Sequence, residues 1–516
     1  FFFKQKTAYE IKECDWSSDV CSSDLITLNG AGSTSNGPRS FGVIGTSSNI
    51  GASGVGFSSN TGWGIAATTG ANDGAWTNGA KTTLTGITTA SGTVYQIAVD
   101  ATVGSGSNKI WFGQNGTWFN SGVPSSGTSP IFSNLPSDMQ FIAAVLVDSG
   151  YDLDVNFGQR PFSYTAPSGF KALCTQNLPT PTILNGANYM AASLYTGTGA
   201  TQTITNTVNG ISFQPDLVWV KNRSVVSDHD LVDSVRGATK VLESDLTGAE
   251  FTEAGNVNAF NSNGFSVGSV ARVNGSGNAL VGWQWKANGA GVTNTAGSVT
   301  ATVSANPTAG FSIIKYTTPS SGSCTVGHGL GVAPVFFMQK ETGASTNWSG
   351  YHSAIGATKA IQLNTTSAAI TNSVYWNNTD PTSTVITIGS GFAGSYAEIL
   401  YAFAPIAGYS AFGSYTGNGS TDGPFIYLGF RPRFVMFKRS DSTGSWYIQD
   451  TSRNPYNQAT LSLYPNLSDA ETSGDDMDYL SNGFKVRDTF SYINASGGTY
   501  IYAAFAENPF TLSRAR

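Results

Sequence analysis

The stretch Pro215-Asp216-Leu217-Val218-Trp219-Val220-Lys221 decides the fold, because the chain repeats its pattern twice. The later copies are Pro334-Val335-Phe336-Phe337-Met338-Gln339-Lys340 and Pro432-Arg433-Phe434-Val435-Met436-Phe437-Lys438. In each copy a proline is followed by an apolar run rich in β-branched and aromatic residues and, six residues on, by a lysine. Such a run predicts a strand that starts at the proline and is buried on both faces. One supersecondary unit is therefore expected three times.

Other residues keep their offset from this proline. Gly237-Ala238-Thr239-Lys240 and Gly356-Ala357-Thr358-Lys359 both begin 22 residues after it (237 − 215 and 356 − 334). A polar residue recurs 18 residues after it, and a Tyr-Thr pair precedes it: Asp233, His352 and Asp450; Tyr195-Thr196, Tyr316-Thr317 and Tyr415-Thr416. A repeat of roughly 100 residues is long enough to bury a small core. We therefore expect three homologous β-sandwich modules, at residues 186–288, 298–405 and 409–510.

The composition narrows the class of protein. Of 516 residues only 11% are charged, 12% are aromatic and 61 are glycine, which is unlike a disordered chain. A net charge of −6 argues against nucleic-acid binding, and no apolar run is long enough to insert into a membrane. Short alternating runs between Gly, Ser, Asn and Thr predict an all-β protein.

The first 25 residues differ from the rest, with no Gly or Pro and eight charges. Lys4–Ile11 and Cys14–Leu25 resemble translated sequencing-adapter read-through at the ends of metagenomic reading frames. We expect residues 1–25 to be a non-native leader. On this expectation the natural N-terminus, with any targeting signal, is missing from the sequence.

Residues 26–178 predict a β-sandwich. Val94–Asp100 alternates, and Lys109–Phe119 contains an Asn-Gly pair between two strand-like runs, a strong hairpin signal. Val155–Phe162, with Pro167–Leu173, resembles the final strand and tail of SPRY domains. The resemblance implies an N-terminally truncated, concanavalin-like sandwich whose loops bind proteins or glycans. The proline-rich residues 179–185 are expected to be a linker.

The SPRY-like tail leads through this linker into modules with Gly-Ala-Thr-Lys and Ser-Asn-Gly-Phe turns (Ser262–Phe265 and Ser481–Phe484). This arrangement resembles tail-fibre and other virion appendage proteins of tailed phages. It implies a non-enzymatic structural or adhesive virion component, assembled in the host cytoplasm. The implied partners are other virion proteins and a host-surface glycan or receptor. A homo-oligomer is also expected, since fibres are oligomeric, although no coiled-coil heptad is present.

Two other functions stay open. One is a bacterial secreted or surface carbohydrate-binding adhesin, which would need a signal or anchor. The other is a polysaccharide depolymerase, with Asp475 and Asp476 as candidate carboxylates. The chain has no P-loop, nucleophile elbow or His-Glu-x-x-His motif, and we expect no enzyme activity, cofactor or metal site. Asp228-His229-Asp230 could form a metal or acid/base cluster, but the aligned tripeptides Asn347-Trp348-Ser349 and Ser445-Trp446-Tyr447 favour a loop that feeds a strand.

Isolated aromatic residues in polar loops are typical of glycan-binding surfaces, where a ring stacks on the sugar and amides bind its hydroxyls. They are also typical of the rim of any β-domain. The candidate ligand contacts are Trp76, Trp348, Tyr375, Trp376, Trp446 and Tyr447.

Overall fold

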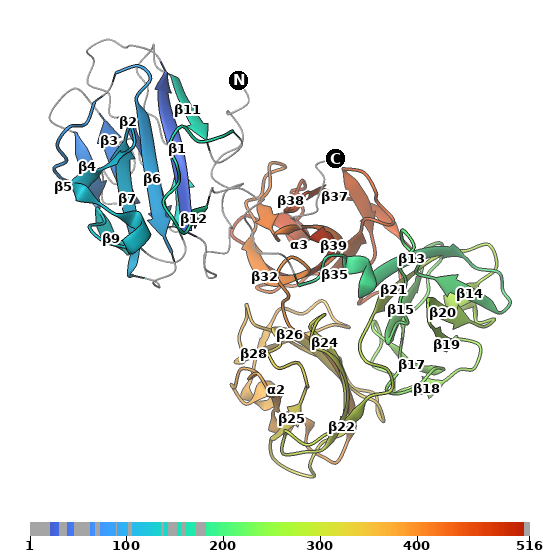
Figure 1. The fold of residues 1–516 in the computed structure, drawn as a ribbon. Helices are drawn as coiled ribbons and strands as arrows, with labels where there is room; N and C mark the ends of the chain where they lie inside the picture. The colour runs from blue at the N-terminus through green and yellow to red at the C-terminus, as the bar shows by residue number, and fades with distance from the viewer. Residues whose placement is uncertain are drawn as a thin grey trace. The chain divides into compact units, whose positions relative to one another are not determined.

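The computed structural model describes residues 21–29, 39–45, 62–67, 73–88, 90–101, 106–135, 139–142, 152–156, 160–171 and 182–509. The chain divides into two compact units, Phe1–Pro179 and Thr180–Arg516, built almost entirely from antiparallel sheets (Figure 1). This confirms the predicted all-β sandwich class. Within the described ranges, no helix has the length and apolar character needed to cross a bilayer.

The first unit contains two sheets that share one core. The order of the first is β11-β1-β6-β7-β8, with β12 beside β1 and β9 beside β7, and that of the second is β10-β2-β3-β4-β5. Tyr95 and Phe112 of the first sheet cluster with Phe41 and Trp63 of the second. The strands are β1 Cys21–Asn29, β2 Arg39–Gly45, β3 Gly62–Ala67, β4 Gly74–Thr77, β5 Ala80–Thr82, β6 Val94–Asp100, β7 Asn108–Gln114, β8 Thr117–Trp118, β9 Phe132–Leu135, β10 Met139–Ile142, β11 Asp152–Asn156 and β12 Phe170–Lys171.

Two sequence predictions can be compared with this unit. The Asn-Gly hairpin is confirmed: Asn115 and Gly116, between β7 and β8, both have positive φ angles, as a tight two-residue turn requires. The boundary expected at Leu25 instead falls inside β1, where Ser22–Leu25 pair with β6. The change in composition at this point therefore does not coincide with the start of the sheet, and residues 1–20 of the expected leader lie outside the described residues.

The second unit repeats one order of four neighbouring strands three times. The strand that follows the repeat proline (the proline-led strand) pairs on one side with the strand that comes next in the chain and on the other side with the last strand of the repeat (the closing strand). The closing strand pairs in turn with a strand from the start of the repeat. We call residues 186–288, 298–405 and 409–510 modules 1, 2 and 3. Their main sheets run β13-β21-β15-β16-β17-β18, β22-β23-β24-β31-β26-β27-β28-β29 and β32-β39-β34-β35. The bounds are β13 Met190–Thr196, β21 Ala279–Trp285, β15 Leu217–Asn222, β16 Asp230–Asp233, β17 Lys240–Glu243, β18 Phe251–Thr252; β22 Val292–Asn294, β23 Ala301–Asn306, β24 Phe311–Thr317, β31 Ala397–Phe403, β26 Phe336–Glu341, β27 Ser349–His352, β28 Lys359–Gln362, β29 Ile370–Thr371; β32 Ser410–Thr416, β39 Thr499–Pro509, β34 Phe430–Arg439 and β35 Trp446–Asp450.

A smaller sheet covers one face of each main sheet. Its strands are β14 Gln202–Thr205, β20 Gly264–Val267 and β19 Val257–Asn261 in module 1, β25 Cys324–Gly327 and β30 Val385–Ile388 in module 2, and β33 Phe425–Tyr427, β38 Gly483–Val486, β37 Thr472–Leu480 and β36 Ala459–Ser462 in module 3. A short turn precedes each closing strand: α1 Ala271–Asn274, η6 Ser390–Phe392 and α3 Ser491–Asn494. Module 2 also has α2 Ser373–Trp376.

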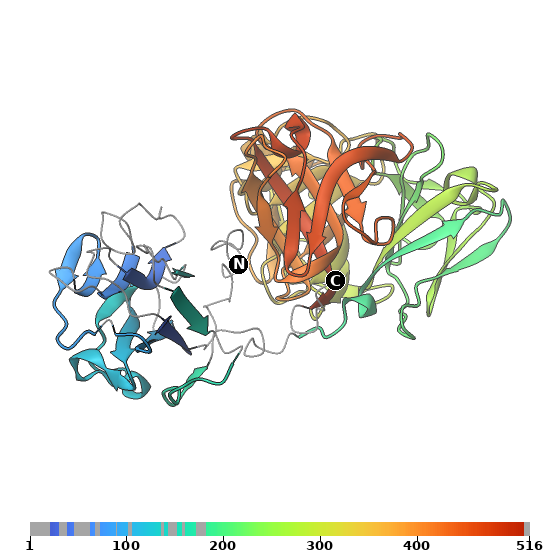
Figure 2. The ribbon, with the colours of Figure 1, turned by 90° about the horizontal axis from the view of Figure 1, so that it is seen from above.

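The other face of each main sheet contributes to one core that the three modules share. Figure 2 shows module 3 (red) in front of module 2, with module 1 (green) beside them. Trp285 of module 1 packs edge-on against Phe403 of module 2 and Phe434 of module 3, with ring centroids 6.4 and 5.4 Å apart. Phe403 in turn packs against Phe505 of module 3 at 5.6 Å. The modules are therefore parts of one ring with a shared core, and modules 1 and 2 each bury a further core between their own two sheets.

Three equivalent backbone contacts close this ring. In each, the residue twelve positions after the repeat proline donates to a carbonyl of the neighbouring module: Thr346 N to Thr247 O at 2.9 Å, Gly444 N to Thr366 O at 2.9 Å and Ser227 N to Ser468 O at 2.7 Å. A second bond returns to the carbonyl eight positions after the proline: Glu250 N to Thr342 O, Ala369 N to Ser440 O and Glu471 N to Arg223 O. Because the same offsets recur at all three interfaces, the repeat encodes a threefold arrangement within one chain.

The polar residue 18 positions after the proline lies at these interfaces. Asp233 accepts a hydrogen bond from the Tyr401 hydroxyl at 2.7 Å, and Asp450 accepts one from Trp283 Nε1 at 3.1 Å. His352 Nε2 donates instead to the Tyr502 carbonyl at 3.1 Å. Asp233 and Asp450 each pair with an arginine three residues on, Arg236 and Arg453, whereas Ile355 follows His352. The aspartate and the arginine three residues after it thus occur together in modules 1 and 3, and both are replaced in module 2.

The repeat lysine is buried in all three modules. Lys221 Nζ donates to Ser468 O and Lys438 Nζ to Thr366 O of a neighbouring module, at 2.9 and 3.3 Å, whereas Lys340 Nζ donates to Ala344 O of its own module at 3.0 Å. Desolvation lowers the pKa of all three ammonium groups to about 8. The lysine that marks the repeat in the sequence therefore satisfies backbone carbonyls inside the ring.

Candidate functional site

Four of the six predicted ligand contacts are core residues. Trp348, Trp376, Trp446 and Tyr447 are at most 4% exposed. No ring face of theirs is left for a ligand, and the prediction is wrong for these four. Trp76 is half-buried in β4 of the first unit. Tyr375, in α2, is half-buried and lines a pocket in module 2.

Trp348 and Trp446 are buried because a neighbouring module covers them. Trp348 Nε1 donates to Glu243 O of module 1 at 2.8 Å, and Trp446 Nε1 donates to Gln362 O of module 2 at 2.9 Å. His229 occupies the aligned position in module 1. Its Nδ1 accepts from Trp219 Nε1 at 3.0 Å, and burial lowers its pKa well below the usual value, so it is a neutral core residue. This supports the interpretation of Asp228-His229-Asp230 as a loop that feeds a strand, and not as a metal or acid/base cluster.

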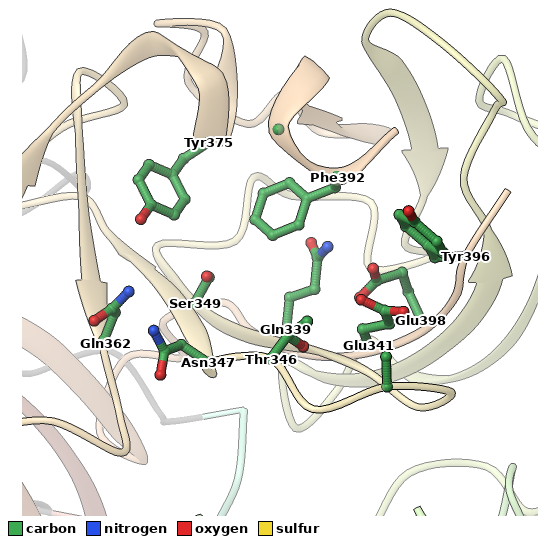
Figure 3. Close-up of a pocket in the computed structure, with 12 residues that line it drawn as sticks. Gln339, Glu341, Thr346, Asn347, Ser349, Gln362, Tyr375, Phe392, Tyr396 and Glu398 are labelled. Carbon is green, nitrogen blue, oxygen red and sulfur yellow. The ribbon is translucent and has the colours of Figure 1, made fainter. Parts of the chain in front are cut away.

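A pocket of about 460 Å³ opens within the sandwich of module 2, between the main sheet and the turns around α2 and η6 (Figure 3). Tyr375, Phe392 and Tyr396 supply aromatic rings on one side. The main sheet supplies amide, carboxyl and hydroxyl groups, and the remaining lining residues are Gln339, Glu341, Ala344, Thr346, Asn347, Ser349, Gln362, Gly391 and Glu398. None of these lining residues is a lysine, arginine or histidine.

Side chains of modules 1 and 3 fill the corresponding space. In module 1, Arg272 of α1 reaches Asp230 Oδ1 at 3.2 Å and Glu243 Oε1 at 3.8 Å. Strand pairing makes Asp230 and Glu243 the equivalents of Ser349 and Gln362, since each pair is directly opposite in its sheet. In module 3, Tyr492 of α3 stacks on Tyr447 with centroids 5.0 Å apart.

Module 2 has a glycine at this place. Gly391 is the second residue of η6, as Arg272 is of α1 and Tyr492 is of α3. Gly391 contributes no side chain to this turn, and the pocket beside Ser349 is open. Phe392, the next residue, stacks on the buried Trp376 ring at 5.6 Å, which holds it as one wall of the pocket.

Two buried polar groups lie in the pocket without a complete set of partners. Gln339 and Glu398 are each 1% exposed. The Gln339 amide approaches the Glu398 carboxyl, but no described group meets good hydrogen-bond geometry with either amide atom of Gln339 or with Oε2 of Glu398. Burial of an unsatisfied polar group costs roughly 1–3 kcal/mol. Such groups in a pocket are typical of a binding site, where the ligand completes their hydrogen bonds.

Glu398 is directly opposite Glu341 in the pairing of β31 with β26. Desolvation raises the pKa of Glu398 to about 8, and repulsion from Glu341 adds to this. The Gln339 amide and the Lys340 ammonium act in the other direction but do not offset burial. Lys340 is held by backbone carbonyls, so neither glutamate forms an ion pair within the described residues.

Part of this site can be predicted from the sequence. Of the candidate ligand contacts, Tyr375 lines the pocket, as does Asn347, which precedes the candidate Trp348 in the chain. Gln339 and Glu398 belong to strand patterns that predict core, so they carried no functional signal.

No three histidine, cysteine, aspartate or glutamate side chains of the described part of the chain are grouped so as to hold a metal ion. Residues 185–509 match the family described as Domain of unknown function (DUF7483), and the chain belongs to this family. The match treats the three modules as one domain, in agreement with their shared core. No curated protein matches the chain.

Proposed function

We propose that this member of the family is a non-enzymatic structural and adhesive component of a phage virion, and that it binds a host-surface glycan. The observation that carries the glycan-binding part is the module 2 pocket. Aromatic rings on one side and unsatisfied amide and carboxyl groups on the other suit a sugar, which has apolar ring faces and hydroxyl edges. The virion location rests on the resemblance to phage appendage proteins.

A panel of immobilised oligosaccharides, probed with the labelled full chain, tests glycan binding. We expect binding to a subset of glycans that falls roughly fivefold or more in Tyr375→Ala, because loss of an aromatic stacking partner costs about 1 kcal/mol. Tyr456→Ala is the matched control, since Tyr456 is 83% exposed in module 3 and away from the pocket. Equal binding by both variants would overturn the assignment of the pocket.

Mass spectrometry of particles purified from the source sample tests the virion location. We expect the chain among the structural proteins of tailed particles, encoded beside tail or capsid genes. Its recovery from bacterial cell surfaces, encoded behind a secretion signal, would instead favour the bacterial adhesin.

One observation favours the depolymerase as a second candidate. Glu341 and Glu398 face each other in the pocket, and a carboxyl with a pKa near 8 holds a proton at neutral pH, as a general acid must. Release of reducing ends from a bound polysaccharide, abolished by Glu398→Gln, would establish this activity. The candidate carboxylates Asp475 and Asp476 lie in β37, and their side chains are outside the described residues.

A further inference from the structure

We propose that the module 2 pocket selects a sugar that carries a free ammonium group, such as a deacetylated amino sugar. This inference rests on the proposed glycan-binding function and specifies its ligand. It follows from the charges of the pocket and from what fills the same space in the two other modules.

The pocket presents two carboxyl groups and no cation. Glu341 and Glu398 are a directly opposed cross-strand pair, an arrangement that is unfavourable when both are ionised and nothing lies between them. An ammonium group placed beside them would favour the ionised form of Glu398, and it would then donate one N–H to each carboxylate in two charge-assisted hydrogen bonds. A sugar with a carboxylate or phosphate would add a third negative group to the same small space.

The equivalent space of module 1 already contains a cation held by carboxylates. The Arg272 guanidinium pairs with Asp230, Glu243 and Glu253 there, and it also lies over the Phe251 ring, 5.4 Å from the centroid. In module 2, Ser349 and Gln362 take the places of Asp230 and Glu243, while the carboxyls of Glu341 and Glu398 line the same pocket from other positions of the main sheet.

The equivalent space of module 3 contains a ring instead. Tyr492 lies between Tyr447 and Phe490, with interplanar angles of 11° and 20°. The chain thus fills the space once with a cation and once with a flat ring. An amino sugar offers both features in one residue: a ring face for Tyr375 or Phe392 and an ammonium for Glu341 and Glu398.

Calorimetric titration of the full chain at about pH 6 with three β-1,4-linked tetrasaccharides tests this inference. The probes are the glucosamine tetramer, its fully N-acetylated form and the neutral glucose tetramer. We expect the glucosamine tetramer to bind at least roughly tenfold more tightly than the other two, the effect of one or two charged hydrogen bonds. The Glu341→Gln and Glu398→Gln double variant should lose this preference, since the isosteric amides keep the packing and remove the charge.

Two controls separate the pocket from general attraction of a cationic sugar to an acidic chain. Asp469→Asn removes an exposed carboxylate of module 3 and should leave the preference unchanged. Tyr375→Ala should bind the glucosamine tetramer more weakly than the wild type does, and an unchanged affinity in this variant would overturn the inference.

The remaining outcomes are distinct. If an acetylated or neutral tetramer binds as tightly and depends on Tyr375, the ammonium inference fails while glycan binding stands. If none of the three binds, the inference is overturned, and the wider oligosaccharide panel decides the proposed function separately. If the double variant keeps the full preference for the glucosamine tetramer, the two glutamates are not the selecting groups.

Discussion

Trp348 shows why single residues of this chain can be understood only together with a neighbouring module. Its ring is fully buried, stacks on Tyr401 at 6.2 Å and donates to Glu243 O across an interface. Within its own module Asn347-Trp348 resembles an exposed loop, which is how the sequence was interpreted. The residue that covers it comes from about 100 positions earlier in the chain, and no local pattern encodes that contact.

We expect Trp348→Ala to lower the free energy of unfolding by about 3–5 kcal/mol, because it leaves a large cavity and an unsatisfied carbonyl. Urea unfolding followed by circular dichroism measures this. Tyr456→Ala, at an exposed position, should change the same quantity by no more than about 0.5 kcal/mol. A comparably small effect at Trp348 would contradict its place at the interface.

The buried carboxyl of Glu398 should make the stability of the folded protein depend on pH. Its pKa rises on folding to about 8, so the folded protein holds a proton that the unfolded chain releases. The stability that this group contributes is present at low pH and is lost as the pH rises through about 8. Glu341 and Lys340 flank the carboxyl, and Tyr316 and Cys324 face it from β24 and β25.

Glu398→Gln removes this titration without changing the shape of the side chain. The difference in unfolding free energy between variant and wild type should therefore shift in favour of the variant as the pH rises from about 5 to about 8.5. Denaturant unfolding at a series of pH values measures this shift. If the unfolding free energies of the two proteins change with pH in the same way, Glu398 is not buried as a protonated carboxyl.

At the scale of elements, the strands could be predicted from the sequence and the pocket could not. Apolar runs behind Pro215, Pro334 and Pro432 identify β15, β26 and β34 because each buries both faces. Pro432 lies within β34 and not at its start, at a shift in register, since a proline has no N–H for the ladder.

The turns before the closing strands explain why the pocket was missed. Ala271 and Ser491 each begin a turn eight residues before the closing strand, whereas Ser390 begins seven residues before it. Offsets counted along the chain therefore do not align Gly391 with Arg272 and Tyr492. The open space arises from the absence of a side chain, and only the packing of the turn against the sheet shows it.

Filling this turn should close the site. We expect Gly391→Tyr to reduce glycan binding at least roughly tenfold, since the new ring would occupy the space that Tyr492 fills in module 3. The added Cβ would lie 3.0 Å from Val374 O, so α2 must shift by a few tenths of an ångström, and a small fall in Tm is expected. Gly248→Tyr is the control, because nothing lies within 4 Å of its Cβ position. Unchanged binding by a folded Gly391→Tyr variant would refute this origin of the pocket.

At the scale of the whole molecule, the three modules form a closed ring in one chain. The sequence repeats predict three homologous modules, and the common strand order agrees with this expectation. Modules 1 and 2 bury small cores of their own, as the length of the repeat predicts, but two of the three repeat lysines and the polar residue 18 positions after the proline bind across interfaces. Only the assembled ring gives these positions a role.

A fragment that ends at residue 405 should therefore fail to fold. It would expose Trp285 and Phe403, which pack against Phe434 and Phe505 of module 3. We expect this fragment to aggregate or bind a hydrophobic dye, and residues 182–509 to unfold in one cooperative transition. Size-exclusion chromatography and thermal unfolding compare the two. A monomeric, cooperatively folded fragment of modules 1 and 2 would show that the modules are independent.

The central claim is that the chain binds a sugar in the module 2 pocket. A crystal structure of the protein soaked with its tightest-binding oligosaccharide tests this most directly. We predict density for one sugar residue between the rings of Tyr375 and Phe392 and the polar groups of Gln339 and Glu398, with the equivalent spaces of modules 1 and 3 occupied by Arg272 and Tyr492. Sugar density elsewhere on the molecule, with this pocket empty, would contradict the account.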